Sequence, residues 1–504
     1  MHDAERQRRL GFTQAAEAYA RGRMGRREFL RVSALAGFGV LAGCRPRRGE
    51  ANAGNLKLAD TTGPLSAIDP QTEQHKFLRS VGRGFAGATL RIVSEDTPPS
   101  RVTRELARQE FVALTGINIE WEQLPLDRVL AKVSADTARQ AGTHDIFYID
   151  QSWVSKFAGD TVDPRTLLAK KDFAYPGYNF SDILTPLVRH VASDKERIVG
   201  IPYDIPIYIM MYRRDVFEQL KLAPPTTFPE YMEAAKTVHE AMAPRMYGTC
   251  GQWKAGHYSL ECDMTMFLWG HGGSVYGADR HPRISDERAT AAMEYMLQLG
   301  RYMPPAVTTW DWFGQSHAFA QGEVAFYTSW GEFFPEHDSP ARSKIVGLAE
   351  PAPCPQPIAL RPASECGFGE TPGASHQGGS SLAISRHGKQ VDAAWIFLQW
   401  ATSSDVTSRA CILGGGASPI RRSNYEDPRV KARAKVMTGT TRHLEVTLDA
   451  ILNRMGTEPH LPDWPALSVE SFAMELGKMV TGQQNVKTTL ANMARDAEAA
   501  RLQP

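Results

Sequence analysis

The chain has 504 residues, of which 42% are hydrophobic and 22% are charged, so it can bury full-sized cores and should form two or three domains. The formal net charge is +1, and positive charge is concentrated in residues 1–43, which hold eight Arg and four acidic residues. The remainder is slightly acidic, which excludes the basic surface that nucleic-acid binding requires.

The first segment, residues 1–43, has the pattern of an export signal. Arg26-Arg27 precedes an apolar stretch from Val32 to Val40, and Leu41-Ala42-Gly43-Cys44 follows. Paired arginines resemble a twin-arginine signal, and small residues before a cysteine resemble the lipobox of bacterial lipoproteins. A retained transmembrane anchor is the alternative, but the stretch is well short of the roughly 20 residues that a spanning helix needs. We therefore expect cleavage before a diacylated Cys44 and a membrane-anchored protein outside the cytoplasm.

Residues 44–87 are rich in Gly, Pro and charged residues without sustained periodicity, which predicts a tether between the membrane and the folded body. Within it, Gly82-Arg83-Gly84-Phe85-Ala86-Gly87 matches the dinucleotide-binding fingerprint. That motif must follow a strand, whereas this one precedes the first predicted strand, so the sequence gives no support for nucleotide binding.

Strands alternate with helices from Thr89 onward. Apolar runs at Leu90–Val93 and Asp145–Ile149 predict strands, and helical spacing predicts helices before Gly116 and over residues 126–133. This alternation predicts a parallel sheet with helices on its faces, in which ligands bind beyond the carboxyl ends of the strands. The loops at those ends contain Glu95, Asp96, Asp150, Gln151 and Trp153.

A second unit begins after Gly200-Ile201-Pro202-Tyr203. An apolar strand is predicted from Ile207 to Tyr212, and Thr227 with Glu230 forms a capping box for the next helix. Further helices are predicted at 289–299 and 391–400, and we assign Trp395 and Trp400 of the latter to the core. Residues 350–379 are rich in Pro and Gly, which predicts a connector.

Local motifs for catalysis or metal binding are absent from the sequence. There is no Gly-x-Ser-x-Gly, Walker loop, Cys-x-x-Cys or His-Glu-x-x-His, so we expect no catalytic residues, metal or cofactor. His257 and Glu261 share a helical face, for which we favour a satisfied surface pair over metal ligation. Beyond Cys44, two equally spaced cysteine pairs could form disulfides, with isolated buried thiols as the alternative; the five cysteines are Cys250, Cys262, Cys354, Cys366 and Cys411.

Four stretches carry a resemblance to a known family. They are residues 200–228, residues 319–330, residues 378–400 with Gly378-Gly379 at their start, and the closing segment with Trp464, Leu476 and Gly482. In order and spacing they resemble the family 1 extracellular solute-binding proteins, which include maltose- and polyol-binding proteins. The resemblance spans Thr89 to Ala499.

The resemblance implies an α/β, two-lobed periplasmic-binding-protein fold of type II with the ligand cleft between the lobes. The first lobe would comprise residues 89–204 and 378–424, and the second would comprise residues 205–377 and 425–504 with the C-terminal helices. We expect a monomer that closes on a sugar or sugar alcohol and delivers it to an ABC permease. A secreted carbohydrate-active enzyme and a ligand-sensing receptor subunit are the alternatives.

Sugars present apolar C–H faces and a rim of hydroxyls, so aromatic rings and carboxylates are suited to bind them. The family position favours ligand contact for Tyr203 and Trp330. His257 is a further polar candidate, although core packing is the favoured interpretation for it and for its neighbours in sequence. The predicted ligand-binding set is Tyr203, Trp330, Trp153, Glu95, Asp96, Asp150, Asp204, Trp253, Trp269, Glu332, Gly378 and Gly379.

Overall fold

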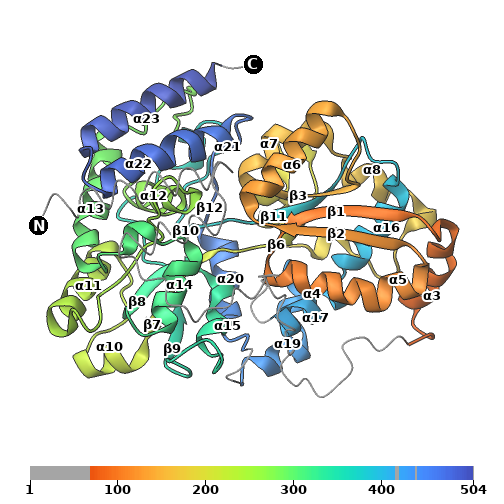
Figure 1. Ribbon diagram of the computed structural model, residues 1–504, viewed down its shortest axis with the longest axis horizontal. Helices are drawn as coiled ribbons and strands as arrows, with labels where there is room; N and C mark the ends of the chain where they lie inside the picture. Colours follow the sequence, from red (N-terminus) through yellow and green to blue (C-terminus); the bar gives the residue numbers. More distant parts are fainter. Residues whose placement is uncertain (1–68, 415–418, 437–439, 503–504) are drawn as a thin grey trace, which may run out of the picture. The chain divides into compact units, whose positions relative to one another are not determined.

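A computed structural model describes residues 69–414, 419–436 and 440–502 of the chain (Figure 1). The expected export signal, the lipidation site at Cys44 and most of the expected tether lie outside these residues. None of the helices within the described ranges has the length and apolar character needed to cross a membrane.

Two sheets organise the described chain (Figure 1). The first has five strands in the order β2-β1-β3-β11-β6, and the second has three in the order β8-β7-β9. Strands β1, β2 and β3 are parallel, whereas β11 runs antiparallel to β3 and β6. The strands are β1 Thr89–Glu95, β2 Asn118–Leu124, β3 Ile146–Asp150, β4 Ser193–Asp194, β5 Arg197–Ile198, β6 Ile201–Asp204, β7 Tyr208–Arg213, β8 Phe326–Trp330, β9 Ala349–Ala352, β10 Ser375–His376, β11 Ser380–Ile384 and β12 Met455–Gly456.

Helices separate most of these strands, as the alternating pattern predicts. In the first half of the chain they are α3 Glu73–Ser80, α4 Pro98–Leu106, α5 Val112–Thr115, α6 Leu126–Arg139, α7 Val154–Phe157, α8 Pro164–Leu168, α9 Thr185–Val191, α10 Arg214–Leu220 and α11 Phe228–Met242. In the second half they are α12 Tyr258–Gly270, α13 Glu287–Leu299, α14 Trp312–Ala320, α15 Phe334–His337, α16 Val391–Ala401, α17 Ser404–Gly414, α18 Arg422–Glu426, α19 Pro428–Arg433, α20 Leu444–Asp449, α21 Trp464–Ala466, α22 Ala473–Val480 and α23 Val486–Arg501.

The five-stranded sheet and the helices packed on it form what we call the first lobe. Its core joins buried strand residues to α16, and the indole of Trp400 donates a hydrogen bond of 2.9 Å to the buried Glu110. The structure differs from the expected tether at residues 73–80. These residues form α3, because Thr72 caps the helix and Leu78 is completely buried in this core.

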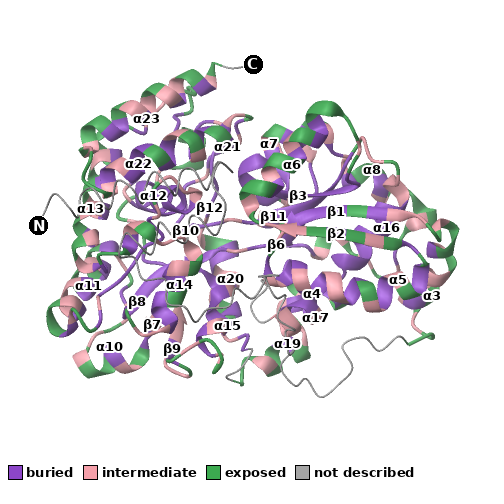
Figure 2. Cartoon of the chain, viewed as in Figure 1, coloured by how far each residue is buried: buried purple, intermediate pink, exposed green. Residues whose placement is uncertain are grey.

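The three-stranded sheet and its helices form the second lobe. The capping box of Thr227 and Glu230 is confirmed at the start of α11. Figure 2 shows strands β7 and β8 as largely buried, while α23 alternates between buried and exposed residues. Helices α22 and α23 pack beside α12 and α13 in one hydrophobic core, which contains Trp464, Leu476 and Leu490.

Two of the chain segments that connect the lobes run between strands. One runs from β6 to β7 and the other from β10 to β11. They lie side by side, because Ile207 pairs with Gln377 and the Gly378 N–H donates to the Pro206 carbonyl at 2.8 Å. A side chain at Gly378 would meet the ring of Trp330 at 3.0 Å, so glycine permits this close approach.

The five cysteines in the described chain are free thiols, and all except the partly buried Cys366 are buried. The two disulfides considered from their spacing are therefore not formed. The interpretation of His257 and Glu261 as a surface pair is also wrong. Glu261 is fully buried in the second lobe, and His257 instead caps α12 by accepting a hydrogen bond from the Ser259 N–H.

Candidate ligand-binding site

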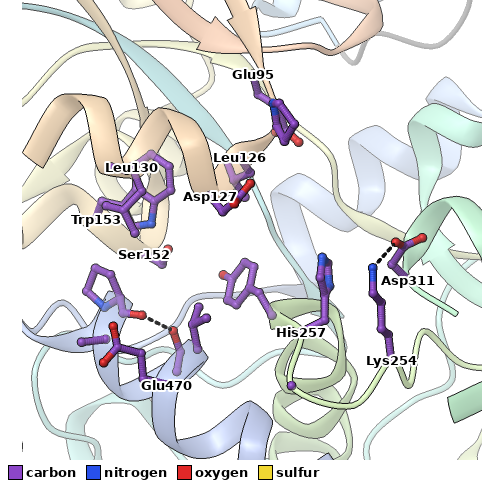
Figure 3. A pocket seen from close by; sticks show the side chains of 18 of the residues that line it. Glu95, Leu126, Asp127, Leu130, Ser152, Trp153, Lys254, His257, Asp311 and Glu470 are labelled. Atoms are coloured by element: carbon purple, nitrogen blue, oxygen red, sulfur yellow. Dashed lines mark hydrogen bonds and ion pairs between the residues drawn. The ribbon is translucent and has the colours of Figure 1, made fainter. Parts of the chain in front are cut away.

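A pocket of about 870 Å³ is lined by residues of both lobes (Figure 3). The first lobe contributes the end of β1, the start of α6 and the turn after β3. The second lobe contributes the starts of α12 and α14 and the segment around α21. The lining residues are Glu95, Pro125, Leu126, Asp127, Leu130, Ala131, Ser134, Ser152, Trp153 and Lys156 of the first lobe, and Lys254, Gly256, His257, Tyr258, Asp311, Trp312, Phe313, Pro465, Ala466, Ser468, Val469 and Glu470 of the second.

Local structure fixes the second-lobe wall of this pocket. Lys254 and Asp311 form an ion pair of 3.0 Å, which Figure 3 shows beside His257. Asp311 also caps α14 by accepting hydrogen bonds from two backbone N–H groups. Burial and the positive charge of Lys254 lower the pKa of His257, so its imidazole is neutral near pH 7. This wall therefore offers a neutral imidazole and a paired cation to a polar ligand.

The first-lobe wall contains a group of carboxyls at the strand ends. The Tyr148 hydroxyl lies 3.2 Å from Asp204 Oδ2 and 3.4 Å from Glu95 Oε2. Because this hydroxyl carries a single proton, it can donate to only one of the two carboxyl groups at a time. Burial and the negative charges of Asp204 and Asp150 raise the pKa of Glu95 to about 8. Desolvation raises the pKa of Asp204 to about 6. Part of the Glu95 surface still faces the pocket, so a protonated Glu95 can donate a hydrogen bond to a ligand hydroxyl.

Glu332 brings a further carboxyl from the second lobe. It lies two residues beyond β8, and burial together with the charges of Asp204 and Glu95 raises its pKa well above the usual value. One oxygen of Glu332 and one of Asp204 are buried without a hydrogen-bond partner. Buried polar atoms are normally hydrogen-bonded, so these oxygens mark a place between the lobes where a polar ligand would be stabilised.

A direct hydrogen bond between the lobes lies next to the pocket. Gln151, in the turn after β3, donates through Nε2 to Glu458 Oε2 at 2.7 Å. The hydroxyl of the pocket residue Tyr258 lies 3.0 Å from both oxygens of Glu458, and the Trp464 indole donates to Oε2 at 2.8 Å. The Gln151 side-chain oxygen remains without a partner. The pocket is thus bounded by a polar contact that bridges the lobes.

The predicted site residues fall into distinct places. Glu95 and Trp153 line the pocket, and Asp150 lies behind it, where its carboxylate accepts from the Ser152 N–H at 2.9 Å. Asp96 is exposed and forms an ion pair of 2.7 Å with Arg101. These groups lie at or just beyond the ends of β1 and β3, the two strands whose ends the sequence pattern singled out.

The other predicted aromatic residues lie outside the pocket lining. Tyr203 donates to the Pro99 carbonyl at 3.1 Å within the first lobe. Trp330 packs edge-on against Tyr208 at a ring-centre distance of 4.4 Å. Trp253 and Trp269 are buried in the second lobe, and the Trp269 indole donates to Glu370.

The two predicted glycines lie in the second connection between the lobes, and each is closely approached by a side chain. A Cβ at Gly378 would meet Trp330, and one at Gly379 would meet Val191 at 2.9 Å. These glycines therefore shape the connection and allow its neighbours to pack against it.

Sequence reasoning missed several pocket residues. Asp311 carried a usable signal, because an aspartate before an apolar helical stretch is a typical N-cap. Lys254, Asp127 and Glu458 carried no local signal, because only tertiary packing brings them to the pocket or its border.

Comparisons with known proteins agree on the family and on the fold. Residues 107–438 match the family described as bacterial extracellular solute-binding protein. A Sinorhizobium fredii protein named as a probable amino-acid ABC transporter periplasmic-binding protein is 21% identical over 366 residues, covering 70% of this chain and 78% of the relative. An erythritol/L-threitol-binding protein of Mycolicibacterium smegmatis is 22% identical over 367 residues, covering 68% and 72%.

Among solved structures, an ABC transporter solute-binding protein of Agrobacterium radiobacter in complex with ribitol superposes with a TM-score of 0.72 at 23% identity. The superposition covers 82% of this chain and 99% of that chain. The chain shares the two-lobed α/β fold of this neighbour, as the sequence predicted.

Proposed function

Because the chain belongs to the bacterial extracellular solute-binding proteins, we propose that it captures a sugar or sugar alcohol for an ABC importer. The observation that carries this proposal is the pocket of about 870 Å³, to which both lobes contribute polar and aromatic groups. Members of this family are binding proteins and not enzymes. A volume of this order suits a small ligand that becomes enclosed on binding.

The chemistry of the pocket supports a hydroxylated, uncharged ligand. Trp153, Trp312 and Phe313 supply apolar faces for C–H groups, while Glu95, Asp127 and His257 supply hydrogen-bonding groups. Erythritol/L-threitol and ribitol are the ligands named for one relative and for one structural neighbour. Both are sugar alcohols, which is the same class of ligand.

We further propose that ligand binding closes the lobes and that the closed form docks to the permease. A ligand that touches groups on both lobes binds the closed state more tightly, and this difference in affinity shifts the equilibrium toward closure. The moving bodies are proposed to be residues 89–204 with 378–424 and residues 205–377 with 425–504. A ligand-sensing receptor role would use the same closure with a different docking partner.

A thermal-shift panel tests the substrate class. The panel contains erythritol, ribitol, mannitol and maltose, with leucine and glutamate as the amino-acid arm. A ligand that binds only the folded state at 100 times its Kd stabilises it by about 2.7 kcal/mol, so we expect a sugar or sugar alcohol to raise Tm by a few degrees. The same ligand should lower the radius of gyration in solution scattering. A shift with amino acids alone would make the substrate class wrong, and a shift without compaction would contradict closure.

We also propose that the protein acts as a monomeric lipoprotein outside the cytoplasm, exported by the twin-arginine route and anchored through a diacylated Cys44. The sequence Leu41-Ala42-Gly43-Cys44 after paired arginines supports this. Intact-mass analysis of membrane-extracted protein should give a chain that begins at a lipid-modified Cys44. A chain that retains Met1 or begins at an unmodified Cys44 would contradict the proposal.

A further inference from the structure

Three potential metal ligands meet in the interior of the second lobe. Cys262 lies on α12, His376 ends β10, and Glu458 lies two residues beyond β12. Strands β10 and β12 pair in parallel with His376 opposite Gly456, and this pairing brings Glu458 next to the histidine. All three side chains are completely buried, and their ligand atoms lie within 4.8 Å of one another.

One tautomer of His376 directs a nitrogen lone pair toward the cluster. Its Nδ1 lies 2.7 Å from Thr265 Oγ1, and the same hydroxyl lies 2.9 Å from the Cys262 carbonyl. When the single hydroxyl proton of Thr265 is donated to that carbonyl, its oxygen accepts from the Nδ1–H. The lone pair is then on Nε2, which has no hydrogen-bond partner and lies 3.5 Å from Glu458 Oε1. In this tautomer the Nε2 lone pair and the Glu458 carboxyl face each other, an arrangement that a metal ion between them would stabilise.

Surrounding side chains hold the potential ligands in place. The Trp269 ring stacks on His376 with a centroid distance of 5.5 Å and an interplanar angle of 15°. Gln151 and the Trp464 indole both donate to Glu458 Oε2, while Oε1, which lies 3.0 Å from the Tyr258 hydroxyl, is the oxygen nearer to His376. Hydrogen bonds from surrounding residues that orient a ligating histidine and carboxylate are the usual support of protein metal sites.

A second buried carboxyl lies beside the cluster. Glu261 adjoins Cys262 in sequence, is fully buried, and has no hydrogen-bond partner on either carboxyl oxygen. Within residues 69–414, 419–436 and 440–502, no lysine or arginine forms an ion pair with Glu261 or Glu458, so no cationic side chain pairs with either carboxyl.

We propose that Cys262 Sγ, His376 Nε2 and Glu458 Oε1 bind a zinc ion. Sulfur, imidazole nitrogen and carboxylate oxygen are the three donor types that Zn²⁺ accepts, and three protein ligands leave a fourth tetrahedral position for water. Binding breaks the S–H bond of Cys262 and releases its proton to solvent, while the thiolate electron pair forms the Zn–S bond. One thiolate, one carboxylate and a neutral imidazole balance the charge of the divalent ion. This site would bind zinc whether or not the pocket takes a sugar alcohol.

Cobalt substitution tests the proposal on the untagged full-length chain. Metal is first removed by a chelator, and the protein is then incubated with Zn²⁺ and dialysed. We expect about one equivalent of Zn²⁺ to stay bound, since the chain has one such cluster in its described part. Replacing zinc by Co²⁺ should give a thiolate-to-cobalt charge-transfer absorption band in the near ultraviolet. Zn²⁺ should also raise Tm, because it binds the folded state.

Variants identify the ligands. Cys262→Ser should lose the charge-transfer band, and His376→Gln should lower Zn²⁺ affinity by at least tenfold. The matched control is Cys411→Ser, which removes another completely buried thiol, on α17 and in a separate hydrophobic cluster, and should keep the band. Far less than one equivalent of zinc in the unmodified chain, or bound cobalt without a thiolate band, would overturn the proposal even if a variant failed to fold. Persistence of the band in Cys262→Ser would overturn it as well.

Discussion

Replacing Trp153 by alanine is expected to raise the Kd for the sugar alcohol that binds most tightly in the panel by about tenfold to a hundredfold. Each tenfold change corresponds to about 1.4 kcal/mol of binding free energy. Trp153 lines the pocket in the turn after β3, and its indole is held with only 4% of its surface exposed. Its removal deletes a preformed apolar face against which C–H groups can stack. Isothermal titration calorimetry on both proteins measures the change in Kd.

Trp121→Ala is the matched control for this measurement. Trp121 has a similar exposure of 8% and belongs to the same lobe, but it lies on β2 and outside the pocket lining. Both substitutions should lower the free energy of unfolding, because each removes a large buried side chain. Only Trp153→Ala should change Kd. Equal weakening by the two variants would show that general loosening of the first lobe causes the effect, and not lost contact with the ligand.

Titration of Glu95 is expected to lower folding stability without ligand between about pH 5 and pH 8, and Glu95→Gln should remove this contribution. The pKa of Glu95 rises from 4.5 to about 8, chiefly through burial and then through Asp204 and Asp150. In this interval the folded state holds a proton that the unfolded state has released. The stabilisation is therefore complete below pH 4.5 and is lost as the pH rises through about 8.

Most of the charged groups around Glu95 act in this direction. Asp204 and Asp150 raise the pKa of Glu95, whereas the hydrogen bond from Tyr148 lowers it. Glu332 approaches from the second lobe, and the nearby Arg101 is paired with Asp96. A difference of one pH unit in pKa corresponds to about 1.4 kcal/mol, and water in the pocket reduces the effect. We expect Glu95→Gln to recover about 1–3 kcal/mol at pH 8 relative to pH 5.

Denaturant unfolding at four pH values between 5 and 8 measures this difference. Glu120→Gln is the control, because Glu120 lies on β2 of the same lobe, with 65% of its side chain exposed and in an ion pair with Arg91. Exposed pairs contribute little to stability, so this variant should keep the pH dependence of the unmodified chain. A Glu95→Gln protein that keeps the full pH dependence would contradict the assignment to Glu95.

Local signals in the sequence were sufficient for many of the elements. The capping box at Thr227 and Glu230 was predictable because both hydrogen bonds join residues three positions apart. The alternation of strands and helices after Thr89 was predictable for a similar reason, since apolar periodicity reflects which face of each element is buried. These signals, with the family resemblance, were enough to predict a two-lobed α/β fold and two strands that end near Glu95 and Asp150, although both strands extend one or two residues further than predicted.

Only the tertiary structure decided which side chains meet. Lys254 and Asp311 pair across 57 positions, and Gln151 reaches Glu458 across 307. The Cys262, His376 and Glu458 cluster joins three distant segments, so no local sequence motif could indicate it. Each of these contacts depends on how β-strands pair and how the chain crosses between the lobes, and a pattern over a few neighbouring residues carries no information about such long-range packing.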